Sequence, residues 1–191
     1  MRRLALLLTL AIAPTLLAQE KISQVRQDLL DPFMDASGEC LALAKAIPEE
    51  KYKWRPMEGV RSFGEVFVHM AGSTLLFCSY AGVPPPPGPA HDLAAIYMKR
   101  GFEMPELFAA ERAIKTKAQT IAVMDQAFHV ASDMIRKMPD SDLEKRLDFF
   151  GTPMTMRALL IHLDEHLGEH LGQSIAYARV NLIVPPWSQK K

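Results

Sequence analysis

The residues best suited to chemistry in this chain of 191 residues are its six histidines. Three of them, His162, His166 and His170, follow one another at intervals of four residues. Side chains four residues apart lie on the same face of an α-helix, so two such imidazoles can bind one metal ion. If this segment is helical, its spacing predicts a metal site.

The positions of the apolar residues predict which two histidines face a neighbouring helix. A helix turns by about 100° per residue, which places His170 about 60°, His166 about 100° and His162 about 145° from the centre of the apolar face. We therefore expect His166 and His170 to point toward a partner, and His162 to lie near the polar side. The apolar face is formed by Leu159, Leu160, Leu163, Leu167, Leu171 and Ile175.

A third ligand is available in the segment 63–80. His69 lies about 110° from the centre of that segment's apolar face, so two helices packed side by side could bring it to the other pair. Three imidazoles around one ion, with positions left for water or substrate, are typical of catalytic metal sites. Each histidine could instead be a hydrogen-bonded core residue, and His91 and His129 are not assigned to the site.

A rival pattern in the same segment is the H-x-x-E-H sequence of the inverted zinc peptidases. It occurs at His162–His166 and again at His166–His170. Those peptidases complete their zinc site with a carboxylate well downstream. No Asp or Glu follows His170 here, so the sequence disfavours a peptidase.

The elements that must position these histidines are predicted to be helices. Helical periodicity extends over residues 21–46, 63–80, 113–138 and 155–180. Shorter elements are expected at residues 92–99, a helix, and at 145–153, a brief strand and turn. Ser62 and Glu65 form a capping-box pattern at the start of the second helix, and the run 84–89, with five prolines, follows it. We predict an all-α four-helix bundle with a long Pro-rich crossover after the second helix.

The first 18 residues are predicted to be a signal peptide. Arg2 and Arg3 precede an apolar run over residues 4–13, and a small residue, Ala18, precedes the predicted cleavage site. Residues 19–191 then form one domain, which is secreted or periplasmic and has no stable membrane span. An uncleaved signal that anchors the chain is the alternative. In an oxidising compartment Cys40 and Cys78 could pair, but we expect two free, buried thiols.

Composition excludes two broad classes of protein. With 49% hydrophobic residues the chain can bury a core, which excludes a disordered protein. The 22 basic and 22 acidic residues balance, which argues against nucleic acid as a partner. Of the polar and aromatic residues outside the helices, Arg61 is expected to be a solvated charge, while Trp54 and Trp187 are expected to cover the ends of the bundle.

Three segments of the chain resemble the DinB-like proteins of the DinB/YfiT superfamily. The segment 52–69 is similar to the region that leads into that family's first metal-binding histidine, 166–173 is similar to its paired histidines, and the tail 176–188 is similar to one branch of the family. The resemblance implies a four-helix bundle that holds a divalent metal ion, Zn, Ni or Fe, through His69, His166 and His170. It also implies a possible homodimer.

Enzymes of that family transfer or isomerise substrates with a low-molecular-weight thiol as cofactor. A metal ion with an open position can bind and deprotonate a thiol or water. We therefore expect an exported metal-dependent transferase or hydrolase that acts on an unknown small-molecule substrate. The alternative is a non-catalytic bundle that binds a small molecule or a protein, with a structural metal or none.

Overall fold

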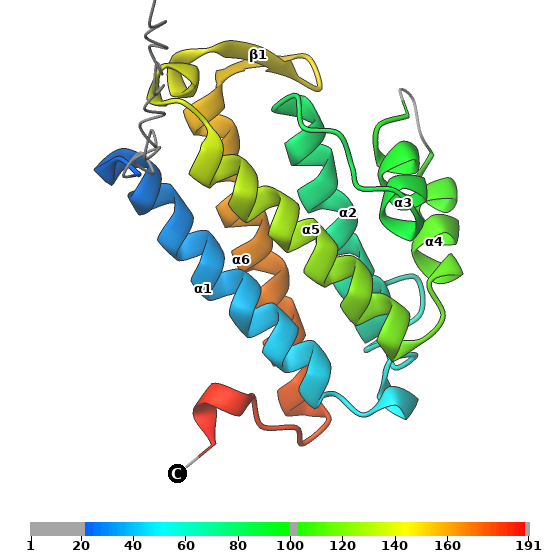
Figure 1. Ribbon diagram of the computed structural model, residues 1–191. Coiled ribbons are helices and arrows are strands. Elements are labelled where there is room, and N and C mark those ends of the chain that lie inside the picture. The colour runs from blue at the N-terminus through cyan, green and yellow to red at the C-terminus, as the bar shows by residue number, and fades with distance from the viewer. Residues whose placement is uncertain (1–21, 100–102, 190–191) are drawn as a thin grey trace, which may run out of the picture.

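The computed structural model describes residues 22–99 and 103–189, and these form six α-helices and one β-hairpin (Figure 1). The predicted signal peptide lies outside the described residues. No helix within them is both long and apolar enough to cross a membrane. The helices are α1 (Gln24–Ala46), α2 (Phe63–Tyr80), α3 (Pro89–Tyr97), α4 (Met104–Ala113), α5 (Lys117–Lys137) and α6 (Met156–Val180), and the strands of the hairpin are β1 (Arg146–Phe149) and β2 (Thr152–Thr155).

The four long helices pack side by side. Both α1 and α2 contact α5 and α6. As Figure 1 shows, α2 and α5 run in the same direction, opposite to α1 and α6. The chain must therefore return along the length of α2, which is about 27 Å for its 18 residues, before α5 can begin. The segment between them, which contains the Pro-rich run, α3 and α4, makes this return.

Helix α2 lies at the centre of the packing, and its start follows the predicted capping box. The Ser62 hydroxyl accepts a hydrogen bond from the Glu65 amide, and a Glu65 oxygen accepts one from the Ser62 amide at 2.8 Å. Of the 18 residues of α2, 15 are buried, because α3, α4, α5 and α6 all contact it. Any polar side chain on α2 must therefore find its partners inside the protein.

One predicted helix boundary is wrong, and the fold class is confirmed only in its coarser form, a mostly helical protein. The helix expected over residues 113–138 starts too early, since Ala113 ends α4 and α5 begins at Lys117. Thr116 caps α5 by accepting a hydrogen bond from the Gln119 amide, a second capping box that the periodicity obscured. The all-α expectation was also incomplete, because the predicted strand and turn form a two-stranded antiparallel hairpin.

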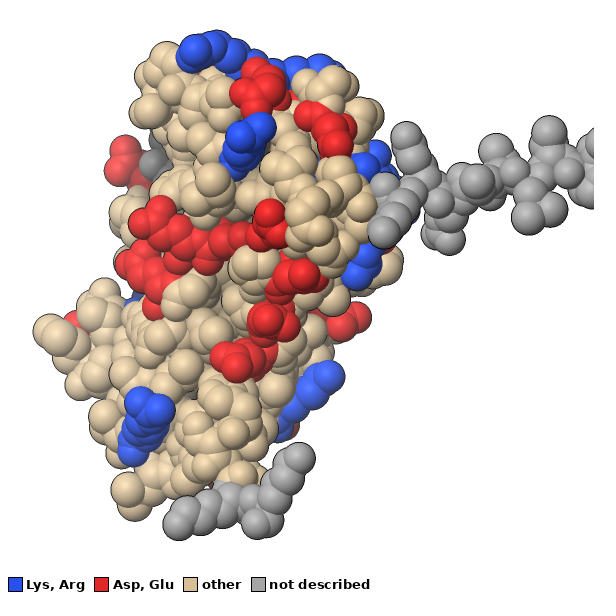
Figure 2. Space-filling model, turned by 90° about the vertical axis from the view of Figure 1, so that its left-hand side faces the viewer, with Lys and Arg blue, Asp and Glu red and all other residues tan. Residues whose placement is uncertain are grey.

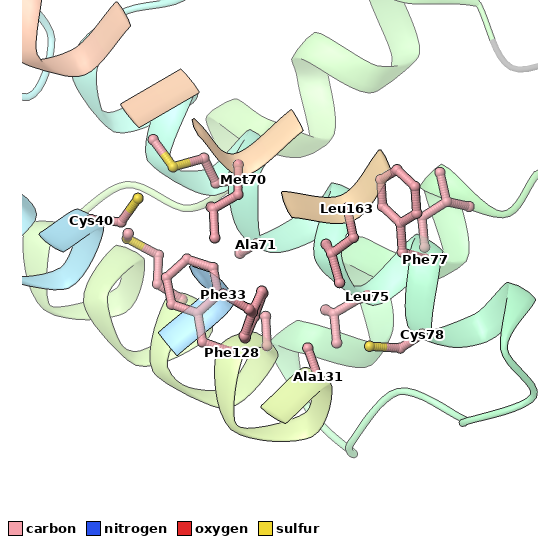
Figure 3. Packing of buried hydrophobic residues seen from close by; sticks show 14 of the residues in the cluster. Phe33, Cys40, Met70, Ala71, Leu75, Phe77, Cys78, Phe128, Ala131 and Leu163 are labelled. Carbon is pink, nitrogen blue, oxygen red and sulfur yellow. The ribbon is translucent and has the colours of Figure 1, made fainter. Parts of the chain in front are cut away.

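The core contains the two cysteines as free thiols, as expected. Phe33 of α1 packs edge-on against Phe128 of α5, with ring centroids 6.1 Å apart. Cys40 and Cys78 are both buried and unpaired, and they lie on opposite sides of the cluster drawn in Figure 3. Burial raises the pKa of Cys78 to about 12 and that of Cys40 further, so neither thiol ionises near neutral pH.

The two tryptophans behave differently. Trp54 packs against Tyr177 and Phe63, with ring centroids 5.4 and 5.7 Å apart, where α2 begins and α6 ends. The expectation that Trp54 covers an end of the bundle is therefore confirmed. Trp187 lies in the short turn after α6 and is 39% exposed, so it covers that end only in part.

Candidate metal centre

Three of the six histidines meet where α2 lies against α6. The ring centroid of His69 is 5.2 Å from that of His166 and 4.6 Å from that of His170. The two rings on α6 are themselves 4.6 Å apart. One nitrogen from each ring lies within 4.8 Å of the others, so the cluster could hold a metal ion.

The nitrogen atoms fit such an ion better than they fit a hydrogen-bonded core. Nε2 of His166 is buried and has no hydrogen-bond partner within the described part of the chain. Leaving a buried polar atom unpaired is costly, and such atoms are rare in folded proteins. Bonds from zinc to imidazole nitrogen are about 2.1 Å long, so small side-chain rotations would bring all three rings onto one ion.

His69 is held by a buried acidic partner. Its Nδ1 lies 3.0 Å from Oε1 of Glu111 and 2.8 Å from the hydroxyl of Tyr97. An ionised carboxylate can only accept hydrogen bonds, so Nδ1 carries the hydrogen and Nε2 presents its lone pair. Nε2 has one long contact, 3.5 Å from the Ser73 hydroxyl. A carboxylate that fixes the outer nitrogen of a histidine is the usual support of a metal ligand.

Arg61 keeps Glu111 ionised. The guanidinium donates from Nε to Oε2 at 2.8 Å and from Nη2 to Oε1 at 2.9 Å, and the Glu111 side chain is fully buried. Burial by itself raises the pKa of Glu111, but hydrogen bonds from His69 and Arg61 outweigh it and leave that pKa below its ordinary value. The expectation of a solvated Arg61 is therefore wrong, because only 16% of its side chain is exposed.

A glycine permits this arrangement. Tyr97 of α3 donates a hydrogen bond to Glu111 at 2.7 Å, and its ring lies directly over Gly72 of α2. A Cβ atom at Gly72 would lie 2.3 Å from the Tyr97 ring, closer than real contacts allow. Gly72 follows His69 by three residues, so it lies on the same side of α2.

His170 is held within its own helix. Its Nδ1 lies 2.8 Å from Oε1 of Gln173, whose amide nitrogen donates to the Tyr177 hydroxyl at 3.0 Å. Because Oε1 of Gln173 accepts, Nδ1 of His170 carries the hydrogen and Nε2 is free to bind.

Burial keeps His69 and His166 in the neutral form that metal ions bind. It lowers the pKa of His166 to about 3, with the neighbouring His170 and His69 adding to the effect. It also lowers the pKa of His69, although Glu111 opposes this. Both rings are therefore uncharged at neutral pH, as a metal ligand must be.

The remaining histidines lie elsewhere. His162 packs edge-on against Phe77, 5.5 Å between ring centroids, and 46% of its side chain is exposed. His91 on α3 and His129 on α5 are 60% and 75% exposed. The structure thus brings together the three histidines that the sequence selected and leaves out the other three.

Acidic side chains surround the outer side of the cluster's helix. Figure 2 shows Asp and Glu gathered across the middle of one face of the molecule. Glu165 and Glu169 are exposed on α6, next to His166 and His170. On α1 no Lys or Arg interrupts the segment between Arg26 and Lys45, which carries Asp28, Asp31, Asp35 and Glu39. The negative electrostatic potential of these carboxylates attracts cations.

Comparison with known proteins identifies the family of this chain. The family model of the DinB superfamily matches residues 35–174, most of the chain and all three clustered histidines. The chain belongs to the DinB superfamily. No curated protein matches it.

Solved structures of DinB-like proteins share the fold. One from Bacillus cereus ATCC 10987 is 18% identical, with a TM-score of 0.58 over 84% of this chain and 95% of the other. One from Bacillus subtilis is 19% identical, with a TM-score of 0.51 over 85% of this chain and 99% of the other. At these identities the likeness shows the mostly helical fold of the DinB superfamily and nothing finer.

Proposed function

We propose that this DinB-superfamily protein binds one divalent metal ion through His69, His166 and His170 and activates a thiol or water for a transfer or hydrolysis reaction. The observation that carries the proposal is the buried Nε2 of His166, which has no partner among residues 22–99 and 103–189 and lies beside two imidazoles whose outer nitrogens are already hydrogen-bonded. In this proposal the four long helices are a four-helix bundle of the DinB/YfiT type, and the metal ion lies between α2 and α6.

The residues around the cluster have separable tasks in this proposal. A bound Zn, Ni or Fe ion would supply a Lewis acid that lowers the pKa of a thiol or water. Glu111 and Arg61 fix the tautomer of His69, and Gln173 fixes that of His170. All three ligands are neutral, so they do not offset the charge of a divalent ion, which favours an anionic fourth partner.

Neither cysteine of the chain can supply the thiol. Both cysteines are buried in the core with raised pKa values, so neither can attack a substrate. Export, which the signal sequence predicts, bears on the choice between the two nucleophiles. Low-molecular-weight thiols are chiefly cytosolic, so an exported protein would use water or meet a thiol outside the cell.

A second function fits one observation. His69 already has two hydrogen-bonded partners and could be stable without an ion, as in a binding protein whose metal is structural or absent. The two proposals differ in the fourth coordination position of the metal ion. In an enzyme it is open to a thiol or water, and in a binding protein it is closed or no metal is bound.

Metal content tests the site. The experiment measures bound metal by elemental mass spectrometry on untagged protein that begins at Gln19, beside His166→Ala and the same-helix control His162→Ala. We expect about one ion per chain in the parent and in His162→Ala, and none in His166→Ala, with helical circular dichroism retained in all three. Absence of metal after incubation with Zn, Ni and Fe would overturn the proposal.

Accessibility of the fourth position separates enzyme from binder. The protein is loaded with Co²⁺ and titrated with azide and with 2-mercaptoethanol while the visible spectrum is recorded. A spectrum that changes with either reagent supports an open, reactive site. A spectrum that changes with neither supports a structural metal.

A further inference from the structure

A continuous row of aromatic rings leads from the histidine cluster to the tip of the hairpin. Phe77 lies 6.0 Å from His166 and stacks on Phe149 at 5.0 Å, and Phe149 contacts both Tyr80 at 4.8 Å and Phe150 at 4.9 Å, centroid to centroid. We call Phe77, Tyr80, Phe149 and Phe150 the aromatic strip. Half-exposed His162 borders it, with its ring 5.8 Å from that of Phe149.

Phe150 has an unusual backbone at the tip. Phe149 pairs with Thr152, so the hairpin turns through two residues, Phe150 and Gly151, whose φ angles are +51° and +84°. Two positive φ angles define a type I′ turn, whose first position favours Asn, Asp or Gly. A bulky side chain with positive φ is strained, so the turn holds an aromatic ring where a polar residue would fit better.

Holding the hairpin in place does not require this ring. The stacked pair Phe77 and Phe149 already fixes the hairpin on α2. Phe150 is 57% exposed, and its ring contacts those of Tyr80 and Phe149 with centroids 5.6 and 4.9 Å apart. The end of the strip at Phe150 is therefore open to solvent, while Phe77, which contacts His166 at the other end, is buried in the core. Half-exposed His162, one turn before His166 on α6, contacts both Phe77 and Phe149 and so joins the open end to the cluster.

We propose that the aromatic strip binds the apolar part of the substrate, so that the protein acts on molecules with a metal-binding group at one end and an aromatic or similarly flat apolar group at the other. This rests on the proposed function, because the polar end would lie at the histidine cluster. The strip belongs to the same seam between α2 and α6 as the cluster. On α2, Phe77 lies two turns beyond His69, and on α6, His162 lies one turn before His166.

The test compares two thiols that differ only in an aromatic ring. Phe150 is three ring-to-ring steps of 6.0, 5.0 and 4.9 Å from His166, so the probe needs a long spacer between its thiol and its ring. Isothermal titration measures the binding of 6-phenylhexanethiol and hexanethiol to the zinc-loaded full domain, to Phe150→Asn and to His166→Ala. Asn suits the first position of a type I′ turn, so Phe150→Asn should fold with an unchanged or higher melting temperature. We expect the parent to bind 6-phenylhexanethiol about tenfold more tightly than hexanethiol, and Phe150→Asn to lose most of that preference.

The variants keep the two proposals apart. His166→Ala should weaken the binding of both thiols while 6-phenylhexanethiol remains the tighter. If the parent binds no zinc, the proposed function fails, and the strip is then judged on 6-phenylhexanethiol alone, which should still bind less tightly to Phe150→Asn. Equal affinity for the two thiols in the parent, or an unchanged preference in Phe150→Asn, would overturn the inference. So would sedimentation showing that Phe150→Asn dissociates a dimer, since the strip would then be a subunit interface.

Discussion

Helices α2 and α6 both supply histidines to the cluster, but they satisfy their polar atoms in opposite ways. On α2 the buried polar side chains, from Glu65 through His69 to Thr74, all have hydrogen-bond partners. On α6 three buried atoms lack one: Oδ1 of Asp164, Nε2 of His166 and Oγ of Ser174, and these are all such atoms in the described part of the chain.

The two sides of the candidate centre therefore differ in whether their buried polar atoms need a ligand. On the α2 side His69 has hydrogen-bond partners without a ligand, because α3 and α4 supply Tyr97 and Glu111. On the α6 side Nε2 of His166 has no such partner, and a ligand there would supply one. We therefore expect changes on the α2 side to cost stability and metal together, and changes on the α6 side to cost little stability.

Removing Glu111 should have the largest effect. Glu111→Ala leaves Arg61 and His69 without their buried partner, which should cost about 3–5 kcal/mol of unfolding free energy. Metal affinity should fall about 10- to 100-fold, because the support of His69 is lost. Urea unfolding and a competitive zinc titration measure the two effects. The control is Glu169→Ala on α6, and equal losses in both variants would contradict the comparison.

The second largest effect is expected at Glu65, whose contribution to stability should fall at low pH. Burial alone raises the pKa of Glu65, but hydrogen bonds from the Ser62 amide, Arg112 and Arg55 outweigh it and lower that pKa below its ordinary value of 4.5. A lowered carboxyl pKa contributes stability above the unfolded value, and the contribution is lost as the pH falls through the folded value. Glu65→Gln should therefore cost about 2 kcal/mol at pH 7 and much less at pH 3.

Chemical denaturation of the parent and Glu65→Gln at pH 7, 5 and 3 measures this difference. Glu165→Gln on α6, where 75% of the side chain is exposed, is the matched control and should shift stability by less than about 0.5 kcal/mol. A deficit in Glu65→Gln that stays constant from pH 7 to pH 3 would contradict the assignment.

Two glycines give a smaller contrast of opposite sign. Gly72→Ala forces a methyl group into the Tyr97 ring and should cost about 1–3 kcal/mol. Gly168→Ala on α6 meets nothing within 4 Å and should stabilise the protein by about 0.5–1 kcal/mol, because alanine favours helix. Melting temperatures of the two variants should move in opposite directions, and a shared direction would refute the close fit at Gly72.

An effect of similar size to that at Gly168 is expected at Ser174. Its side chain is fully buried and its hydroxyl has no partner within the described residues. Ser174→Ala should raise the unfolding free energy by about 1 kcal/mol, because the cost of burying an unpaired hydroxyl disappears. A loss of stability in thermal unfolding would show that the hydroxyl has a partner after all, such as a bound water.

The sequence was informative about the cluster because local rules apply to it. Helical spacing selects His166 and His170 over His162, and the capping box at Ser62 sets the start of α2, which fixes the turn on which His69 lies. The grouping of these three residues followed from such rules and from the family resemblance. Their role as metal ligands stays a prediction.

The support of His69 could not be predicted in the same way. Arg61 and Glu111 are 50 residues apart, and nothing local to either shows that they pair. Helix α4, which carries Glu111, was missed although Pro105 and Glu106 are typical of a helix start. Gly72 in the interior of the second predicted helix was the available sign that another element, in this case Tyr97, comes close.

The partners of His69 come from α3 and α4, outside the four long helices. His69 can therefore lose these hydrogen bonds while the rest of the protein stays folded. These two short helices could detach in a partial opening that leaves α1, α2, α5 and α6 packed. In a metal-bound protein, retention of the ion should then follow the local stability of α3 and α4 rather than the melting temperature. Hydrogen exchange in these two helices would report how quickly a bound metal ion is released.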